Sequence, residues 1–171
     1  MEPKRISPDA VPAALEKALR YRLLKEPRQA ESICRDVLLV DPGNQEATIM
    51  LLLALTDQFA REKASAFDAA KALLGSLDNP YHQAYYDGII KERWAAAQLA
   101  DQMPREIALD WFRQAMRAYE KAEPLAAPGT PDPVLRWNTC ARVILRAEAR
   151  KREAHVRRDV AAEFGDEVPL R

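Results

Sequence analysis

Prolines divide this chain into segments of similar length, and they constrain its fold more than any other feature. Pro27, Pro42, Pro80 and Pro104 stand between stretches in which apolar residues recur at intervals of three and four. Because proline lacks an amide hydrogen and disfavours helical geometry in the residue before it, each of these positions ends one helix or begins the next. The pattern predicts amphipathic helices joined by turns, and no strand.

The composition also favours helices. Alanine and leucine are abundant, whereas only 5 of the 171 residues are glycine and 7% are aromatic. Alanine and leucine lose little side-chain freedom in a helix, while the scarcer β-branched residues fit strands better. Since 48% of the residues are apolar, the chain can bury a core. We therefore expect a folded helical domain and neither a disordered chain nor a sheet-based enzyme.

The spacing of apolar residues predicts about seven helices. They are expected near residues 12–24, 27–40, 44–58, 62–77, 81–102, 104–123 and 133–158. Short connections between consecutive helices favour antiparallel neighbours, so the predicted fold class is all-α with antiparallel helix pairs. We expect a flexible N-terminus over residues 1–10, a helical domain over 11–150, and a polar helical extension with an acidic tail over 151–171.

Small and aromatic residues have a distinctive spacing in the first helix pair. Ala18 precedes Tyr21 by three residues, Ala30 follows nine residues later, and Pro42 comes after another twelve. This set resembles the tetratricopeptide repeat, a helix pair of about 34 residues. In such a pair the small residues let two helices approach, the aromatic ring fills the gap, and the proline stops the second helix.

The later segments match that repeat less closely. The pair near residues 45–80 has Leu52 and Leu55 where small and aromatic residues are expected, and in the third pair Gly88 and Ala108 are twenty residues apart instead of twelve. The last predicted helix has no partner. The resemblance spans about residues 11–150 and implies a short tetratricopeptide-like α-solenoid, with another helical bundle as the alternative.

In tetratricopeptide proteins the first helix of each pair lines a concave groove that binds a peptide or a helix. The resemblance therefore implies a non-catalytic adaptor or scaffold of bacterial type that binds another protein. Its groove residues would be Leu19, Arg22, Ile49, Leu53, His82, Tyr85, Ile89, Glu92, Arg93, Trp137 and Asn138. Leu15 and Leu19 replace the polar pair of the family's carboxylate clamp, which predicts a largely apolar groove suited to an amphipathic helix. Alternatively, the last helix fills this groove itself.

The net charge of zero, from 26 basic and 26 acidic residues, conceals a basic final helix. Residues 134–160 carry eight basic side chains against three acidic ones. The possible basic patch consists of Arg142, Arg146, Arg150, Lys151, Arg152, Arg157 and Arg158. A basic helix can bind nucleic acid or an acidic partner, although such a face is more often simply solvated. This binding mode, or a structural homo-oligomer, is the alternative to a protein-binding adaptor.

We find no motif for catalysis, a metal or a cofactor. His82, His155, Cys34 and Cys140 lack the close spacing of zinc ligands, and the glycines do not form a phosphate-binding loop. The two cysteines lie in apolar helical patterns, as expected for free buried thiols. The first residues also lack the apolar run of a secretory signal. We therefore predict a cytoplasmic protein with no cofactor and no membrane partner, and with nucleic acid less favoured as a partner than protein.

Overall fold

The computed structural model describes residues 3–101 and 103–164 of the chain. Within that part it contains seven α-helices and three short 3-10 helices, and no strand, so the predicted all-helical class is confirmed. In chain order the elements are η1 (Pro8–Ala10), α1 (Val11–Leu23), α2 (Pro27–Val40), α3 (Gln45–Thr56), α4 (Phe59–Ala72), η2 (Leu73–Ser76), α5 (Pro80–Ala100), α6 (Arg105–Ala122), η3 (Glu123–Leu125) and α7 (Asp132–Phe164). The acidic tail predicted at the C-terminus lies largely outside the described residues, as do residues 1–2.

Most of the predicted helices lie close to their expected positions; α7 ends at Phe164, six residues later than predicted, and a further difference is at α4. This helix begins at Phe59, three residues earlier than predicted, and its last turn is the 3-10 helix η2. The backbone carbonyl of Gln58 accepts hydrogen bonds from the amides of Arg61 and Glu62, at 2.9 Å each. A turn of only two residues thus separates α3 from α4, and no proline marks it in the sequence.

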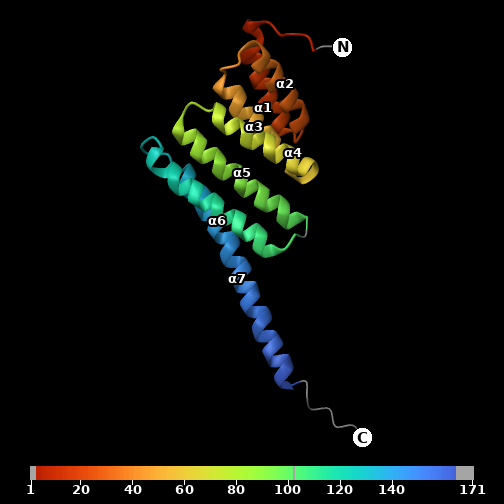
Figure 1. Ribbon diagram of the computed structural model, residues 1–171, viewed down its shortest axis with the longest axis vertical. Helices are drawn as coiled ribbons and strands as arrows, with labels where there is room; N and C mark the ends of the chain where they lie inside the picture. Colours follow the sequence, from red (N-terminus) through yellow and green to blue (C-terminus); the bar gives the residue numbers. More distant parts are fainter. Residues whose placement is uncertain (1–2, 102, 165–171) are drawn as a thin grey trace.

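Each helix packs chiefly against its neighbours in the sequence. Each helix from α1 to α6 contacts the next helix in the chain. In addition, α1 contacts α3, and α3 contacts α5. The result is an elongated stack with α1 and α2 at one end and α6 and α7 at the other (Figure 1). Among the described residues, the last helix packs chiefly against α6.

The small residues of the first helix pair lie inside the protein. Ala18 and Ala30 are fully buried in one hydrophobic cluster, and Tyr21 packs against that cluster. Helix α2 ends at Val40, two residues before Pro42. The residues that resemble a tetratricopeptide repeat therefore lie where α1 and α2 pack together.

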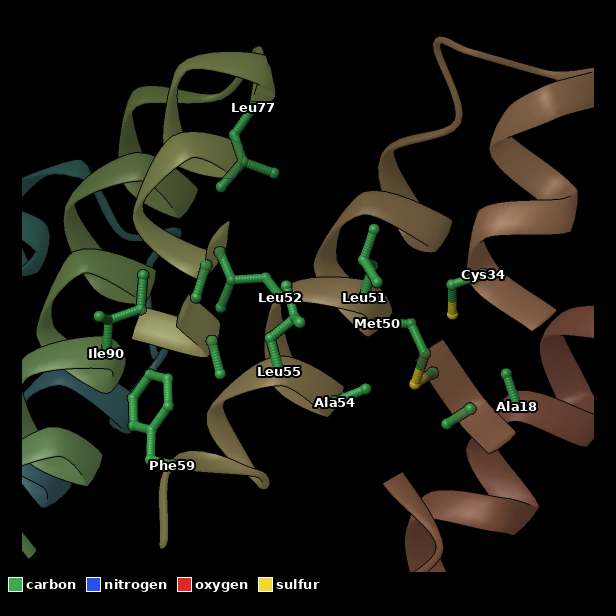
Figure 2. Close-up of a cluster of buried hydrophobic side chains, with 13 residues drawn as sticks. Ala18, Cys34, Met50, Leu51, Leu52, Ala54, Leu55, Phe59, Leu77 and Ile90 are labelled. Atoms are coloured by element: carbon green, nitrogen blue, oxygen red, sulfur yellow. The ribbon is translucent and has the colours of Figure 1, made fainter. Parts of the chain in front are cut away.

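Helix α3 forms the centre of the first hydrophobic cluster because it is covered on two sides. Met50, Leu51 and Ala54 point towards α1 and α2, while Leu52 and Leu55 point towards α4 and α5 (Figure 2). A helix that is apolar on nearly every side requires such burial. The almost uninterrupted apolar run in this segment thus has a structural reason.

A second cluster holds α5, α6 and α7 together. Its buried members are Ile89, Ala95, Leu109, Phe112, Ala115, Tyr119, Cys140 and Ile144. Leu53 and Tyr86 pack against both clusters and so connect the two halves of the stack. The part of α7 after Lys151 leaves the body (Figure 1), and the side chains of residues 152–158 are exposed.

Asparagine side chains cap two of these helices. The Asn44 side chain accepts a hydrogen bond from the amide of Ala47 at 2.8 Å, and the Asn79 side chain accepts one from the amide of Tyr81 at 2.9 Å. Each bond satisfies an amide that has no partner within its own helix. None of the described helices is both long enough and apolar enough to cross a bilayer.

Candidate interaction surface

An aspartate brings two of the predicted groove arginines together. Arg22 Nε donates to Asp57 Oδ2 at 2.8 Å, and Arg93 Nη1 forms an ion pair with Asp57 Oδ1. Arg93 Nη1 also donates to Thr56 Oγ1 at 2.7 Å. Asp57 directly follows α3, whereas the two arginines belong to α1 and α5. This arginine–aspartate bridge, Arg22–Asp57–Arg93, therefore connects three helices at one surface.

The bridge is only partly shielded from water. Its side chains retain 15% exposure at Arg22, 28% at Asp57 and 27% at Arg93. Burial lowers the pKa of Arg93, and the neighbouring Asp57 carboxylate opposes that change by raising it. Because an arginine side chain stays protonated in proteins, both guanidinium groups of the bridge keep their positive charge at neutral pH. Its guanidinium groups can also bind a further anionic or carbonyl group.

Four aromatic side chains cluster on the first turns of α5. Tyr81, His82, Tyr85 and Tyr86 contact one another with ring centroids 5.3 to 5.8 Å apart, and Tyr81 stacks on Tyr85. All four are partly exposed. Aromatic rings this close contribute to stability, and their remaining open faces and edges are free to contact other groups. We call these residues the α5 aromatic cluster.

Charged side chains from near both ends of the chain act on the tyrosines of this cluster. Burial raises the pKa of Tyr81 and of Tyr86, and the neighbouring Tyr85 and the Asp132 carboxylate raise both further. The Arg22 guanidinium is close enough to Tyr86 to act in the opposite direction. Both phenols are therefore protonated at neutral pH and can donate hydrogen bonds. The Arg22 side chain of α1 and the Asp132 side chain at the start of α7 thus lie within electrostatic range of the cluster.

Beneath the aromatic cluster, a buried carboxylate links α5, α6 and α7. Glu92 Oε2 accepts from the Tyr119 hydroxyl at 2.6 Å, and Glu92 Oε1 accepts from Arg136 Nη1 at 3.1 Å. Glu92 is 8% exposed. Burial raises the pKa of Tyr119, as does the charge of Glu92, so the tyrosine remains a hydrogen-bond donor. This network holds the three helices together around a carboxylate that is largely shielded from solvent.

The predicted groove residues are therefore distributed over different environments. Ile89 and Glu92 belong to the interior, while Ile49 and Leu53 are half-buried against the core. Leu19 is 45% exposed. Half-buried positions also hold Trp137, whose Nε1 donates to Glu120 at 2.9 Å, and Asn138. Further predicted groove residues that are polar or aromatic and partly exposed are Arg22, Arg93, His82 and Tyr85. The partly exposed members of the predicted set thus include charged and aromatic side chains.

A cleft of about 590 Å³ opens beside the arginine–aspartate bridge, between the α1–α2 turn and the α3–α4 turn. It is lined by Arg22, Lys25, Glu26, Pro27, Arg28, Gln29, Asp57, Gln58, Ala60, Arg61 and Glu62. Seven of these eleven residues are charged. Such a lining suits a polar segment of protein better than an apolar one.

The shape of this cleft depends on an unusual turn after α1. Lys25 has a φ of 61°, in the left-handed region. The amide of Glu26 donates to the Tyr21 carbonyl at 2.9 Å, and the amide of Lys25 donates to the Arg22 carbonyl at 3.0 Å. These two bonds form a Schellman motif, in which glycine is the preferred residue at the left-handed position. The two hydrogen bonds offset the strain of lysine there, which costs about 1 kcal/mol.

The cysteines and histidines do not form a reactive centre in the described part of the chain. Cys34 and Cys140 are both buried and free. Burial raises the pKa of each thiol to about 12, which keeps both protonated and weakly nucleophilic. Across the residues that the structure describes, no group of three or more His, Cys, Asp or Glu side chains could hold a metal ion.

The residues that complete these interactions were not identified from the sequence. Asp57 stands just past the apolar run of α3, a position that a sequence pattern assigns only to a turn. Tyr119 and Arg136 are 27 and 44 residues from Glu92 along the chain. No local spacing connects partners that far apart, so only the packing of the helices identifies them.

All seven residues of the predicted basic patch are exposed on α7. Lys151 Nζ donates to Glu106 Oε1 at 3.0 Å and so ties α7 to the start of α6. Arg142, Arg146 and Arg150 lie on successive turns of one helix face, as the sequence predicts.

Comparison of the chain with protein-family models, curated proteins and solved structures finds no match. The function is therefore inferred from these surfaces.

Proposed function

We propose that this protein is a non-catalytic adaptor with a tetratricopeptide-like arrangement of helix pairs, and that it binds a segment of another protein. The binding surface would run across α1, α3 and α5. The buried Ala18 and Ala30 and the succession of packed helices support the repeat-like arrangement. The partly exposed α5 aromatic cluster beside the arginine–aspartate bridge is the observation that carries the proposal.

The residue types on this surface are those that contribute most to protein interfaces. Tyrosine and arginine are enriched among residues whose truncation costs at least 2 kcal/mol of binding energy. The rings of the α5 aromatic cluster already restrict one another, so binding would order them at little further entropic cost. The bridge adds guanidinium donors held in place by Asp57. A partner segment with apolar side chains and accessible backbone carbonyls complements such a surface.

A capture experiment with matched variants tests this proposal. The full-length protein is immobilised, and the proteins it retains from a lysate of its source organism are quantified by mass spectrometry. The test variant is Y81A/H82A, because both side chains lie outside the two hydrophobic clusters. The control variant is L39A/L125A, which removes apolar side chains that are 51% and 50% exposed elsewhere. Circular dichroism and urea unfolding confirm that both variants keep the fold.

We expect at least one protein that the wild type and L39A/L125A retain equally and that Y81A/H82A retains about tenfold less, as loss of a binding hot spot predicts. Retention that is the same for all three proteins would show that the α5 aromatic cluster is not the binding surface. Recovery of the chain alone, in every replicate, would contradict an adaptor function.

A further inference from the structure

At the other end of the molecule, a cleft of about 290 Å³ opens where the end of α5, the first turns of α6 and the middle of α7 meet. It is lined by Leu99, Arg105, Leu109, Val143, Arg146, Ala147 and Arg150. We call it the arginine cleft. The described residues that line it include three arginines and four apolar side chains, but no carboxylate. The arginines are exposed, whereas the apolar side chains are buried or half-buried.

The geometry of α7 arranges the cationic and apolar groups in two parallel rows. Arg146 and Arg150 are one helical turn apart, about 6 Å along the axis. Val143 and Ala147 form the adjacent row, also one turn apart, and Arg142 extends the arginine row by another turn. Carboxylates spaced four residues apart on an incoming helix have the same 6 Å repeat, so two of them can meet two arginines at once.

A neighbouring cleft differs from the arginine cleft because its lining contains carboxylates. The neighbour, of about 410 Å³, shares Arg105, Leu109, Ala147 and Arg150 with it. Its lining also contains Glu106 and Glu148, and Glu106 is paired with Lys151 at 3.0 Å. With Arg113 and Lys151, that lining holds four basic and two acidic side chains, so the protein's own carboxylates offset part of the positive charge there, whereas no carboxylate lines the arginine cleft.

We infer that the arginine cleft binds an acidic amphipathic segment of a protein partner. Carboxylates of the segment would contact Arg146 and Arg150, and one of its apolar side chains would pack on the floor formed by Leu99 and Val143. This site is independent of the α5 aromatic cluster, and either proposal can fail without the other.

Two features favour an acidic protein segment over other occupants. Over residues 142–158, α7 carries seven basic and two acidic side chains, so the same face of a second copy would be repelled. A nucleic acid would satisfy the arginines through its phosphates, but this contact would leave the apolar floor without a partner. A segment with apolar and acidic side chains at adjacent positions matches both rows.

Fluorescence anisotropy with the full-length protein at low ionic strength tests the inference. The probe is a labelled helical peptide of about 20 residues, which spans about 30 Å, with glutamates four residues apart and leucines on the adjacent face. A second peptide carries glutamine at each leucine position and has the same charge. A single-stranded oligothymidylate of similar length tests binding to nucleic acid.

Four variants distinguish the effect of the arginine charges from the effects of guanidinium geometry and of the apolar floor. R146Q/R150Q removes two arginines of the cleft, and R20Q/R117Q removes two exposed arginines elsewhere with the same change in net charge. R146K/R150K keeps the charge without the planar guanidinium group. V143T alters the polarity of the floor with little change in volume. All five substituted positions are exposed or half-buried, and urea unfolding checks that each variant is folded.

We expect the wild type and R20Q/R117Q to bind the leucine peptide equally, and R146Q/R150Q to bind it about tenfold more weakly. R146K/R150K should lie between them. The wild type should bind the glutamine peptide at least about fivefold more weakly than the leucine peptide, and V143T should reduce binding of the leucine peptide only.

Three results would overturn the inference. Equal affinity for the leucine and glutamine peptides would show that the apolar floor takes no part in binding. Equal losses for R146Q/R150Q and R20Q/R117Q would show only a general effect of charge. Tighter binding of the oligothymidylate, lost in R146Q/R150Q, would assign the arginine cleft to nucleic acid.

Discussion

Gly88 illustrates how one residue can determine the distance between two helices. A Cβ atom at this position would lie 2.7 Å from Cδ1 and 2.8 Å from Cζ of Tyr119. Tyr119 cannot easily move, because it is buried and its hydroxyl is bonded to Glu92. The absence of a side chain at Gly88 therefore permits the close packing of α5 on α6.

We predict that G88A destabilises the protein by about 1–3 kcal/mol, since the added methyl group overpacks the α5–α6 contact. This loss occurs even though alanine is favoured over glycine within a helix by about 1 kcal/mol. The free energy of urea unfolding measures it. G75A is the matched control, because no atom lies within 4 Å of a Cβ at Gly75. A similar loss in both variants would contradict the steric explanation.

At the scale of helices, the arginine–aspartate bridge joins the ends of α1 and α3 to the middle of α5. Asp57 accepts bonds from Arg22 and Arg93 at the same time. Without its charge, two arginines would face each other on a partly buried surface. Removal of the shared partner is therefore more costly than loss of an isolated surface ion pair.

We predict that D57N lowers the free energy of urea unfolding by about 1–2 kcal/mol, a value reduced by the partial exposure of the bridge. The control is D110N, which breaks the Arg113–Asp110 pair, whose side chains are 42% and 69% exposed. D110N should change stability by less than about 0.5 kcal/mol. Equal effects in the two variants would show that the bridge does not hold the helices together.

On the scale of the whole molecule, the two halves of α7 contribute differently to stability. The first half of α7 contributes Cys140 and Ile144 to the second hydrophobic cluster. Its later half is exposed over residues 152–158, after the ion pair of Lys151 with Glu106. Residues 152–158 of α7 therefore add exposed surface and do not help to hold the body of the protein together.

We predict that truncation after Lys151 leaves the free energy of urea unfolding unchanged within about 0.5 kcal/mol, because exposed residues contribute little. The total helical signal in circular dichroism should decrease. Truncation after Cys140, which also removes Ile144, serves as the comparison and should destabilise the protein strongly. If truncation after Lys151 lowers stability by more than about 2 kcal/mol, the extension has a packing role that this fold does not assign to it.

Several features of the fold were predictable from the sequence because their causes are local. Proline positions and apolar spacing located the helices to within a few residues, and Ala18 and Ala30 indicated the close contact of the first pair. The start of α4 was placed too late, since the turn at Asp57 and Gln58 contains neither proline nor glycine. The burial of Ile89 and Glu92, two of the predicted groove residues, did not follow from the pattern, because it depends on how α5 packs against other helices.

By itself, the sequence determined an all-helical protein, the order and approximate bounds of its helices, and a basic α7. These properties depend on backbone preference and on spacing within one helix, which neighbouring residues suffice to define. Only the tertiary structure decided that Asp57 joins Arg22 to Arg93, and that Arg105 meets Arg146 and Arg150. Such contacts depend on the rotation and crossing of helices distant in the chain, which are set by the packing of the whole core.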